Sequence, residues 1–403
     1  MKEKRDVLFL CQFYSPEFAA VAGLATDTAE ALAAAGYSVD VICGYPKSYD
    51  RAGEGAVPMR EVRNGVGIRR LRYIAAGKKN VIRRLVNSYS FYFASLVRLF
   101  SMRKYKLIVT YSNPPMLPHV MTLASKLFGC KTAFIAHDVY PEIAIHTGMC
   151  MEHGLMAGRM RSINRMLAKR LTGLVSISSE MTDFFVEKRG IDRERITTIP
   201  NWHRDTFEEA HGGSGGKFTC GYFGNMGICQ DMETILSCIE KYDDGIDYVF
   251  AGQGTKKEDV EKRVAGLSNV TVHGFLTGQA FSDTLAACDC CVVSLEKGLG
   301  GLCAPSKTYS YLMMGKPIIA VMDEKDIIAD IERYKCGFAV ENGDTEGLRK
   351  ALETLRDDPE LRAEMAAGAR KCFLENYTRE KCCGELAEFV RGMIGDPENE
   401  TNR

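Results

Sequence analysis

The sequence predicts an α/β protein made of two doubly wound, Rossmann-like domains that face a cleft. Its 403 residues are 46% hydrophobic and 26% charged, the balance of an ordinary globular chain. Short apolar runs alternate with helical patterns, as in βαβ units. This series breaks once, at residues 211–216 (HGGSGG), and then starts again, which indicates two domains joined by a flexible segment.

The first domain is predicted over residues 1–205. Its strands are expected at 6–12, 38–43, 107–110, 131–136, 174–177 and 196–199. Helices fill the intervals between these strands. The alanine-rich helix at 25–35 ends at Gly36, since glycine is the usual residue after a helix C-terminus.

The second domain is predicted over residues 206–376. Its strands are expected at 218–222, 247–251, 270–273, 290–294 and 317–321, and its helices at 232–242, 255–265, 280–288, 306–314 and 326–333. Residues 377–403 are expected to form a C-terminal helix that packs back on the first domain, followed by a polar tail. Ligands of open α/β sheets bind outside the carboxyl ends of the strands, so functional residues should follow strands directly.

The segment 290–321 contains the clearest candidate for an anion site. Its strand is followed by a loop with Gly298, Gly300 and Gly301, and then by Ser306 and Lys307 at the start of a helix. Backbone N–H groups at a helix start, with a lysine beside them, suit a phosphate or diphosphate. The alternative is a surface turn capped by Ser306 with a solvated lysine.

A second strand, glycine turn and helix occurs at 221–236, where Gly224 and Gly227 flank the turn. We expect this turn to direct its N–H groups toward the same cleft. Two such loops in one domain strengthen the prediction of a phosphate site.

These motifs, with others along nearly the whole chain, resemble the retaining glycosyltransferases of family 4, which have the glycosyltransferase-B fold. The matching segments are FGNMG (223–227), TIPN (198–201), PSK (305–307) followed by GKP (315–317), QFYSPE (12–17) and HDVYPE (137–142). The last two resemble the bacterial branch that builds O-antigen, capsule and exopolysaccharide.

The resemblance implies that the second domain binds a nucleoside diphosphate sugar. Gly224 and Asn225 would approach the diphosphate, and Lys307 would offset its charge in a catalytic role. Phe275 would hold the base, although a core position is the alternative. The remaining expected donor contacts are Gln230, Glu296, Ser306, Tyr309 and Ser310.

The chain departs from the family pattern at two places. Two glutamates that hold ribose and sugar hydroxyls in many members correspond to Leu302 and Ser310, which leaves Glu296 as the nearest acidic substitute. The usual arginine and lysine of the first phosphate loop correspond to Asn225 and Gln230. Lys307 is therefore expected to carry more of the phosphate binding.

In the first domain, His137 and Asp138 end a predicted strand and are the other catalytic candidates, either on the acceptor or on the donor sugar. Glu17 and Glu142 are candidate acceptor-side ligands, and Gly23 would let a loop approach the sugar phosphate. A simpler interpretation makes the acidic side chains caps of the turns that follow.

The predicted reaction is a retaining, metal-independent transfer without a cofactor. A UDP-sugar, of the N-acetylhexosamine type, would donate to a polyprenyl-diphosphate-linked saccharide, and the enzyme would act as a monomer. Two rivals are a sugar-nucleotide epimerase of the same fold and a non-catalytic sugar-nucleotide-binding scaffold. Fifteen cysteines in a long chain without a signal peptide indicate reduced thiols, and their spacing predicts no metal site.

The zero net charge conceals two oppositely charged halves. Residues 1–206 contain 30 Lys and Arg against 18 Asp and Glu, and residues 60–106 contain 13 against one. Lys78, Lys79, Arg83 and Arg84 are expected to contact an anionic membrane surface, which would place the protein on the cytoplasmic face of the cell membrane. The apolar stripe expected to enter the membrane consists of Val81, Leu85, Tyr89, Tyr92, Leu96 and Leu99. The alternative is a packed helix with solvated arginines; no nucleic-acid motif is present.

Overall fold

The computed structural model describes residues 4–17, 19–46, 57–74, 81–207, 216–242 and 245–397. The chain divides into two compact units. Unit 1 comprises Met1–Pro200 with Glu380–Arg403, and unit 2 comprises Asn201–Arg379. The boundaries proposed from the sequence, 205/206 and 376/377, lie a few residues from these divisions. The glycine-rich segment 211–215 lies outside the described residues.

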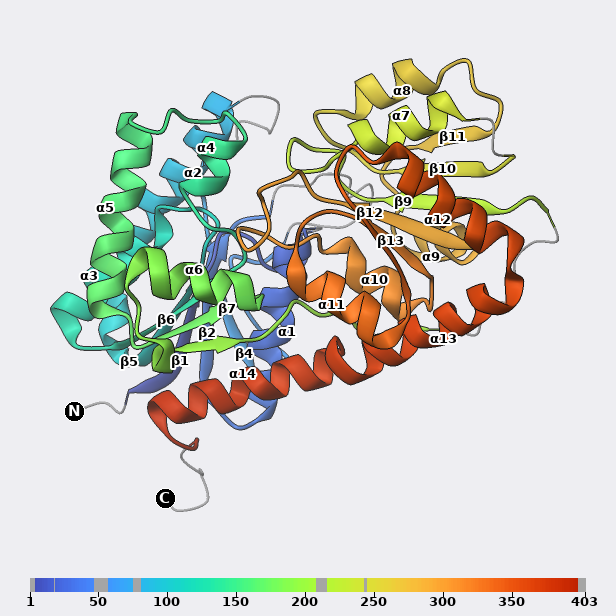
Figure 1. Ribbon diagram of the computed structural model, residues 1–403. Helices are drawn as coiled ribbons and strands as arrows, with labels where there is room; N and C mark the ends of the chain where they lie inside the picture. The colour runs from blue at the N-terminus through green and yellow to red at the C-terminus, as the bar shows by residue number, and fades with distance from the viewer. Residues whose placement is uncertain are drawn as a thin grey trace. The chain divides into compact units, whose positions relative to one another are not determined.

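Unit 1 is built on an eight-stranded sheet of order β3-β4-β2-β1-β5-β6-β7-β8 (Figure 1). The strands are β1 (Arg5–Leu10), β2 (Val39–Gly44), β3 (Arg60–Arg63), β4 (Val66–Leu71), β5 (Tyr105–Tyr111), β6 (Lys131–Ala136), β7 (Gly173–Ser176) and β8 (Ile196–Thr198). The helices are α1 (Ala20–Ala34), α2 (Val81–Leu96), η1 (Leu99–Lys104), α3 (Leu117–Phe128), α4 (Glu142–His146), α5 (Leu155–Arg170), α6 (Ser179–Arg189), η2 (Arg193–Arg195) and most of α14 (Arg379–Ile394).

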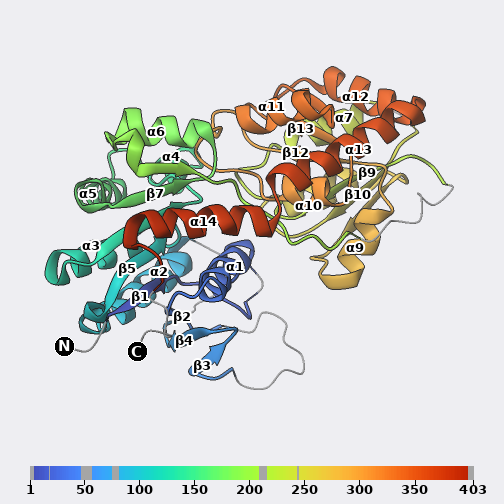
Figure 2. The same ribbon diagram turned by 90° about the horizontal axis from the view of Figure 1, so that it is seen from below.

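All neighbouring strands of this sheet run parallel except β3 and β4, which form an antiparallel hairpin at its edge (Figure 2). This hairpin was not predicted from the sequence. Its signal is Asn64-Gly65, both with positive φ (50° and 77°), which is the preferred pair for a two-residue hairpin turn.

Unit 2 is built on a six-stranded sheet of order β11-β10-β9-β12-β13-β14 in which every pair is parallel. The strands are β9 (Thr219–Phe223), β10 (Asp247–Ala251), β11 (Val270–His273), β12 (Cys290–Ser294), β13 (Ile318–Val321) and β14 (Gly337–Val340). The helices are α7 (Glu233–Lys241), α8 (Lys257–Val264), α9 (Gly278–Ala286), α10 (Lys307–Met313), α11 (Lys325–Tyr334), α12 (Thr345–Asp357) and α13 (Pro359–Asn376). The doubly wound fold of both units is confirmed.

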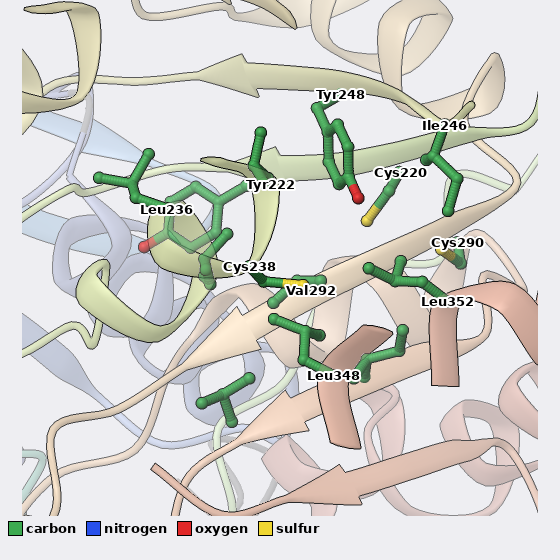
Figure 3. Packing of buried hydrophobic residues seen from close by; sticks show 14 of the residues in the cluster. Cys220, Tyr222, Leu236, Cys238, Ile246, Tyr248, Cys290, Val292, Leu348 and Leu352 are labelled. Carbon is green, nitrogen blue, oxygen red and sulfur yellow. The ribbon is translucent and has the colours of Figure 1, made fainter. Parts of the chain in front are cut away.

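One core cluster of unit 2 combines residues of this sheet with residues of helices α7, α8 and α12. Figure 3 shows part of this cluster, including Tyr222, Leu236 and Leu348. Tyr222 from β9 is 2% exposed and packs in the same cluster as Leu236 and Leu348. The strand therefore delivers its last residues, Tyr222 and Phe223, from a rigid core to the turn that follows. The turn after β9 therefore starts from side chains that are anchored in the core of unit 2.

Residues 380–397 pack within unit 1. Tyr37 donates from its hydroxyl to the carbonyl oxygen of Gly395 at 3.0 Å, and Lys131 donates to the carbonyl oxygen of Met393. Phe389 lies against Gly173 of β7, where an added Cβ would come 2.7 Å from the ring. The end of the chain thereby closes the core of the first unit.

Candidate functional site

Strand β9 leads into a turn that begins at Gly224, and the side chain of Lys307 lies directly across this glycine. Gly224 has a φ of 123°, and a Cβ atom added there would lie 2.5 Å from Cε of Lys307. Glycine is needed for the backbone conformation and for the lysine to pass. The turn after β9 and the start of α10 (Lys307–Met313) therefore meet at one place in unit 2.

Helix α10 is anchored to the end of β9 by Tyr311, which lies one turn after Lys307. The Tyr311 hydroxyl accepts from the amide of Phe223 at 2.7 Å and donates to the carbonyl oxygen of the same residue at 3.1 Å. Residues four apart share a helix face. Lys307 is therefore directed at Gly224, the residue that follows Phe223.

The ammonium group of Lys307 lies above a buried aromatic ring. Its Nζ donates to the carbonyl oxygen of Asn225 at 3.1 Å and lies 4.9 Å from the centre of the Tyr222 ring. The Tyr222 hydroxyl donates to the same carbonyl oxygen at 2.9 Å. No carboxylate in the described part of the chain forms an ion pair with Lys307, and burial lowers the pKa of this side chain to about 7. An anion bound here would restore the charge of the lysine.

Three amide groups of the turn already have acceptors within the protein. Gly224 donates to Ala251 O (2.7 Å), Met226 to Gln253 O (2.7 Å) and Gly227 to Gln230 Oε1 (3.0 Å). The expectation that these N–H groups point at a phosphate is therefore wrong, because the loop after β10 and a side chain of the turn itself occupy them. The amide of Asn225 has no acceptor among the described residues.

Asn225 and Gln230 contact each other. Asn225 donates from Nδ2 to Oε1 of Gln230 at 3.2 Å, and Gln230 Oε1 also accepts from the Gly227 amide. Asn225 is exposed, whereas Gln230 is 9% exposed. Asn225 is thus available to a ligand at the surface of unit 2, and Gln230 supports it from beneath.

Glu296 follows β12 and is paired with a lysine that was not predicted as a site residue. Its Oε1 accepts from Nζ of Lys256 at 2.6 Å. Lys256 follows Gly252 and Gly254, between β10 and α8. This is a third segment in which a strand, a glycine-containing turn and a helix follow one another, as they do at 221–236 and 290–321. That repeated pattern is the signal that could have found it.

The other predicted donor contacts divide into exposed and internal side chains. Phe275 follows β11 and is 53% exposed, so the alternative of a core position is wrong. Ser306 is exposed but makes no side-chain cap of α10, since its backbone is already helical (φ −60°, ψ −15°). Tyr309 is buried against the ring of Tyr377, and Ser310 donates to the carbonyl oxygen of Lys307 at 2.8 Å. Both side chains thus make contacts inside unit 2, and a contact with the donor stays a prediction for them.

In unit 1, His137 and Asp138 follow β6, and a serine fixes their backbone. The amides of both residues donate to Oγ of Ser112, at 3.1 Å and 3.0 Å. Burial lowers the pKa of His137 to about 4 and raises the pKa of Asp138 to about 6. His137 is therefore a neutral ring, packed edge-on against Tyr111, and Asp138 titrates close to neutral pH.

The acceptor-side candidates lie in different local settings. Glu142 begins α4 and pairs with Arg189 at 2.5 Å, so its carboxylate is engaged within the protein. Glu17 is half-buried in the loop after β1. Gly23 lies in the first turn of helix α1, which starts earlier than the sequence suggested, and no atom of the described residues lies within 4 Å of a Cβ added there. This glycine therefore belongs to a helix rather than to a loop, and its approach to the sugar phosphate stays a prediction.

The predicted membrane residues are placed in part. Arg83 and Arg84 are exposed on α2, whereas Lys78 and Lys79 lie outside the described residues. The predicted apolar stripe is wrong at Tyr89 and Tyr92, which pack inward on a buried cluster. That cluster consists of Met116, Met160 and Ile163.

A different apolar row is exposed in this region. It consists of Val86 (37%), Phe93 (59%), Val97 (79%) and Phe100 (68%), which we call the α2 apolar row. Val86 and Phe93 lie seven residues apart on one face of α2, Val97 follows the end of this helix, and Phe100 lies in η1. The guanidinium of Arg103 lies 5.2 Å from the ring of Phe100. Among the described residues no helix has both the length and the apolar composition to cross a bilayer.

Comparison with known proteins identifies both parts of the chain. Residues 21–202 match the family described as glycosyl transferase 4-like domain, and residues 217–358 match the family described as glycosyl transferases group 1. The chain is 26% identical over 309 residues to the probable glycosyltransferase WbjE of Pseudomonas aeruginosa, an alignment that covers 73% of this chain and 76% of that protein.

Solved structures share the fold. HepE from Anabaena, crystallised with UDP, has a TM-score of 0.71 and 14% identity over 96% of this chain and 100% of its own. WaaG, a glycosyltransferase involved in lipopolysaccharide biosynthesis, has a TM-score of 0.69 and 15% identity over 96% of this chain and 100% of its own. At these identities the likeness concerns the fold, which is that of the glycosyltransferases with two Rossmann-like domains.

Proposed function

Because the chain belongs to the family 4 glycosyltransferases with the GT-B fold, we propose that it moves a sugar from a nucleoside diphosphate sugar to a polyprenyl-diphosphate-linked saccharide, with retention of anomeric configuration. In this proposal the donor is a UDP-sugar of the N-acetylhexosamine type, and the product belongs to a cell-surface polysaccharide. The observation that carries it is the ammonium group of Lys307, held at the Asn225 carbonyl beside the exposed end of the β9 turn.

The transfer breaks the bond between the anomeric carbon and the diphosphate oxygen. The bonding electrons leave with the diphosphate, while positive charge develops on the sugar. A fixed cation and N–H donor beside the leaving group stabilise this charge separation. Lys307 and the amide of Asn225 supply these groups, so the proposal includes neither a metal nor a cofactor.

The acceptor hydroxyl must lose a proton as it attacks. In this proposal the leaving phosphate takes that proton on the same face of the sugar, and the Asp138 carboxylate orients the hydroxyl by accepting a hydrogen bond. Its pKa of about 6 leaves Asp138 mostly ionised at neutral pH. His137, neutral because burial lowers its pKa to about 4, provides a polar wall without adding charge.

The names of the relatives support the donor and the pathway. HepE has been solved with UDP and with UDP-glucose, which supports a uridine nucleotide. WaaG acts in lipopolysaccharide biosynthesis, which supports a surface glycan as product. A screen of UDP-sugars tests whether the donor is an N-acetylhexosamine.

The test is a transfer assay with UDP-, GDP- and dTDP-sugars, with and without a polyprenyl-diphosphate-linked acceptor. We expect transfer from a UDP-sugar, and we expect Lys307→Met to lower turnover about a hundred- to a thousandfold. Lys350→Met, on the exposed face of α12, is the control. Epimerised donor without transfer would instead identify an epimerase, and UDP binding without turnover would identify a scaffold.

We also propose that unit 1 contacts an anionic membrane surface as a peripheral protein, through the α2 apolar row and the basic residues beside it. The row exposes aromatic and aliphatic side chains, while Arg83 and Arg84 supply positive charge on α2. Such a combination binds the interface of anionic bilayers. It would bring the enzyme, acting as a monomer on the cytoplasmic face, to a lipid-linked acceptor.

A further inference from the structure

Three neighbouring strands of unit 2, in the order β10-β9-β12, each end in a loop at the candidate donor site. The loop after β9 carries Asn225 and Gln230, the loop after β10 carries Lys256, and Glu296 follows β12. We infer that Lys256 is a positioning residue for the donor diphosphate: paired with Glu296, it clamps the β9 turn in the shape that presents Asn225 and Lys307. This inference rests on the proposed function.

The backbone of Lys256 is fixed against the β9 turn. Its amide donates to the carbonyl oxygen of Met226 at 2.8 Å. Gly252 and Gly254 bring the two segments so close that an added Cβ would lie 1.8 Å from Gly224 O and 2.2 Å from Met226 O, respectively. The backbone position of Lys256 is therefore fixed by its contacts with the β9 turn.

The ammonium group of Lys256 joins the other two loops. Nζ donates to the carbonyl oxygen of Gln230 at 2.6 Å and to Oε1 of Glu296 at 2.6 Å. Charged hydrogen bonds of this length are among the stronger ones in proteins. The side chains of Lys256 and Glu296 are only 29% and 35% exposed, which limits competition from water.

Gln230 connects Lys256 to Asn225 and Lys307, the residues that we assign to the donor diphosphate. Its backbone is held by Lys256, and its side chain accepts from Asn225 Nδ2 and from the Gly227 amide. Asn225 in turn holds Nζ of Lys307 through its carbonyl oxygen. A displacement of Gln230 would thus reach the two groups that we assign to the diphosphate.

The pairing also changes the role of Glu296. A carboxylate that accepts from an ammonium at 2.6 Å is engaged in the protein, so we assign it to the clamp rather than to a donor hydroxyl. Its own backbone supports this assignment, because the Glu296 amide donates to the carbonyl oxygen of Cys229 at 2.9 Å. Both the main chain and the side chain of Glu296 therefore act on the β9 turn.

The test is a double-mutant cycle with Lys256→Met and Glu296→Ala, read by UDP binding and by the donor KM and kcat. We expect each variant to weaken UDP binding and to raise the donor KM about ten- to a hundredfold, with a much smaller change in kcat. The double variant should be no worse than either single variant, because both remove one clamp. Lys256→Arg, which keeps donors for both partners, should recover most of the affinity.

The matched control is Lys262→Met, which removes an exposed Lys–Glu pair from α8 (Nζ to Glu258 Oε1, 2.9 Å) without touching the turn. All variants are first compared by thermal unfolding. If Lys256→Met protein folds and binds UDP like the control, the clamp is wrong. Additive effects of the two substitutions would also contradict it, because they would indicate that Glu296 contacts the donor independently of Lys256. Failure of the wild-type protein to bind UDP would remove the proposed function together with the clamp.

Discussion

The alkyl chain of Lys307 packs over the α-carbon of Gly224 so closely that a methyl group at position 224 would lie 2.5 Å from Cε. Gly224→Ala should therefore displace the ammonium from the Asn225 carbonyl. Because misplacing a catalytic group by about 1 Å costs roughly a hundredfold in rate, we expect a fall of that order in turnover, measured with a UDP-sugar donor.

The control for this variant is Gly245→Ala. Gly245 also has a positive φ (67°), but no atom lies within 4 Å of an added Cβ. Both variants should lose about 1–3 kcal/mol of unfolding free energy from backbone strain, while only Gly224→Ala loses turnover beyond that. Equal turnover in the two variants would contradict the packing argument.

Donor binding should depend on pH through Lys307. Burial lowers the pKa of this lysine to about 7, so in the free protein it loses its proton as the pH rises through 7. The diphosphate of a UDP-sugar binds the protonated form, and binding should therefore take up protons near pH 7–8. The dissociation constant should rise about tenfold per pH unit above 7 until the bound-state pKa is reached.

Isothermal titration calorimetry in buffers of different ionisation enthalpy measures this proton uptake directly. Lys307→Met should abolish the uptake and leave binding weak at every pH. Proton uptake of the same size in Lys307→Met protein would assign the titration to another group.

The fold followed from the sequence because buried parallel strands are continuous apolar runs. Residues 131–136 and 290–294 were predicted with the bounds that the structure gives to β6 and β12. The site followed less completely. The loop after β10 takes the amides of Gly224 and Met226, and this depends on the register of β9 against β10, which no local pattern reports.

Tyr222 illustrates the same limit. By its sequence it is an aromatic residue in a buried strand, and it does pack in the core. Its hydroxyl nevertheless reaches the Asn225 carbonyl, and its ring lies under Lys307. The partner of a side chain at the edge of a core is fixed by tertiary packing, so neither Tyr222 nor Lys256 was predicted as part of the site.

Asp138 should set the acidic limb of the pH–rate profile. Burial raises its pKa to about 6, and the ionised form is the one that accepts a hydrogen bond from the acceptor hydroxyl. The value of kcat/KM should therefore rise with pH through about 6. Asp138→Asn should lower turnover about a hundredfold and remove this limb.

Asp183→Asn, an exposed aspartate on α6, is the matched control and should leave the profile unchanged. Asp138→Asn protein that kept both its turnover and the limb near pH 6 would show that another group titrates there.

The α2 apolar row predicts that unit 1 binds anionic membranes. Replacing apolar residues of the row and replacing the nearby arginines should each weaken this binding, with a different dependence on salt. Vesicles of phosphatidylcholine with phosphatidylglycerol should bind the wild-type protein, and pure phosphatidylcholine vesicles should bind it much less, because each cation near an anionic surface contributes about 1 kcal/mol.

Phe93→Ser with Val97→Ser removes two side chains that are 59% and 79% exposed, so it should lower binding at every salt concentration. Arg83→Gln with Arg84→Gln should lower it mainly at low salt. Leu374→Ser, an exposed apolar change in unit 2 (49%), is the control for co-sedimentation, and unchanged partitioning of both double variants would place any membrane contact on another surface.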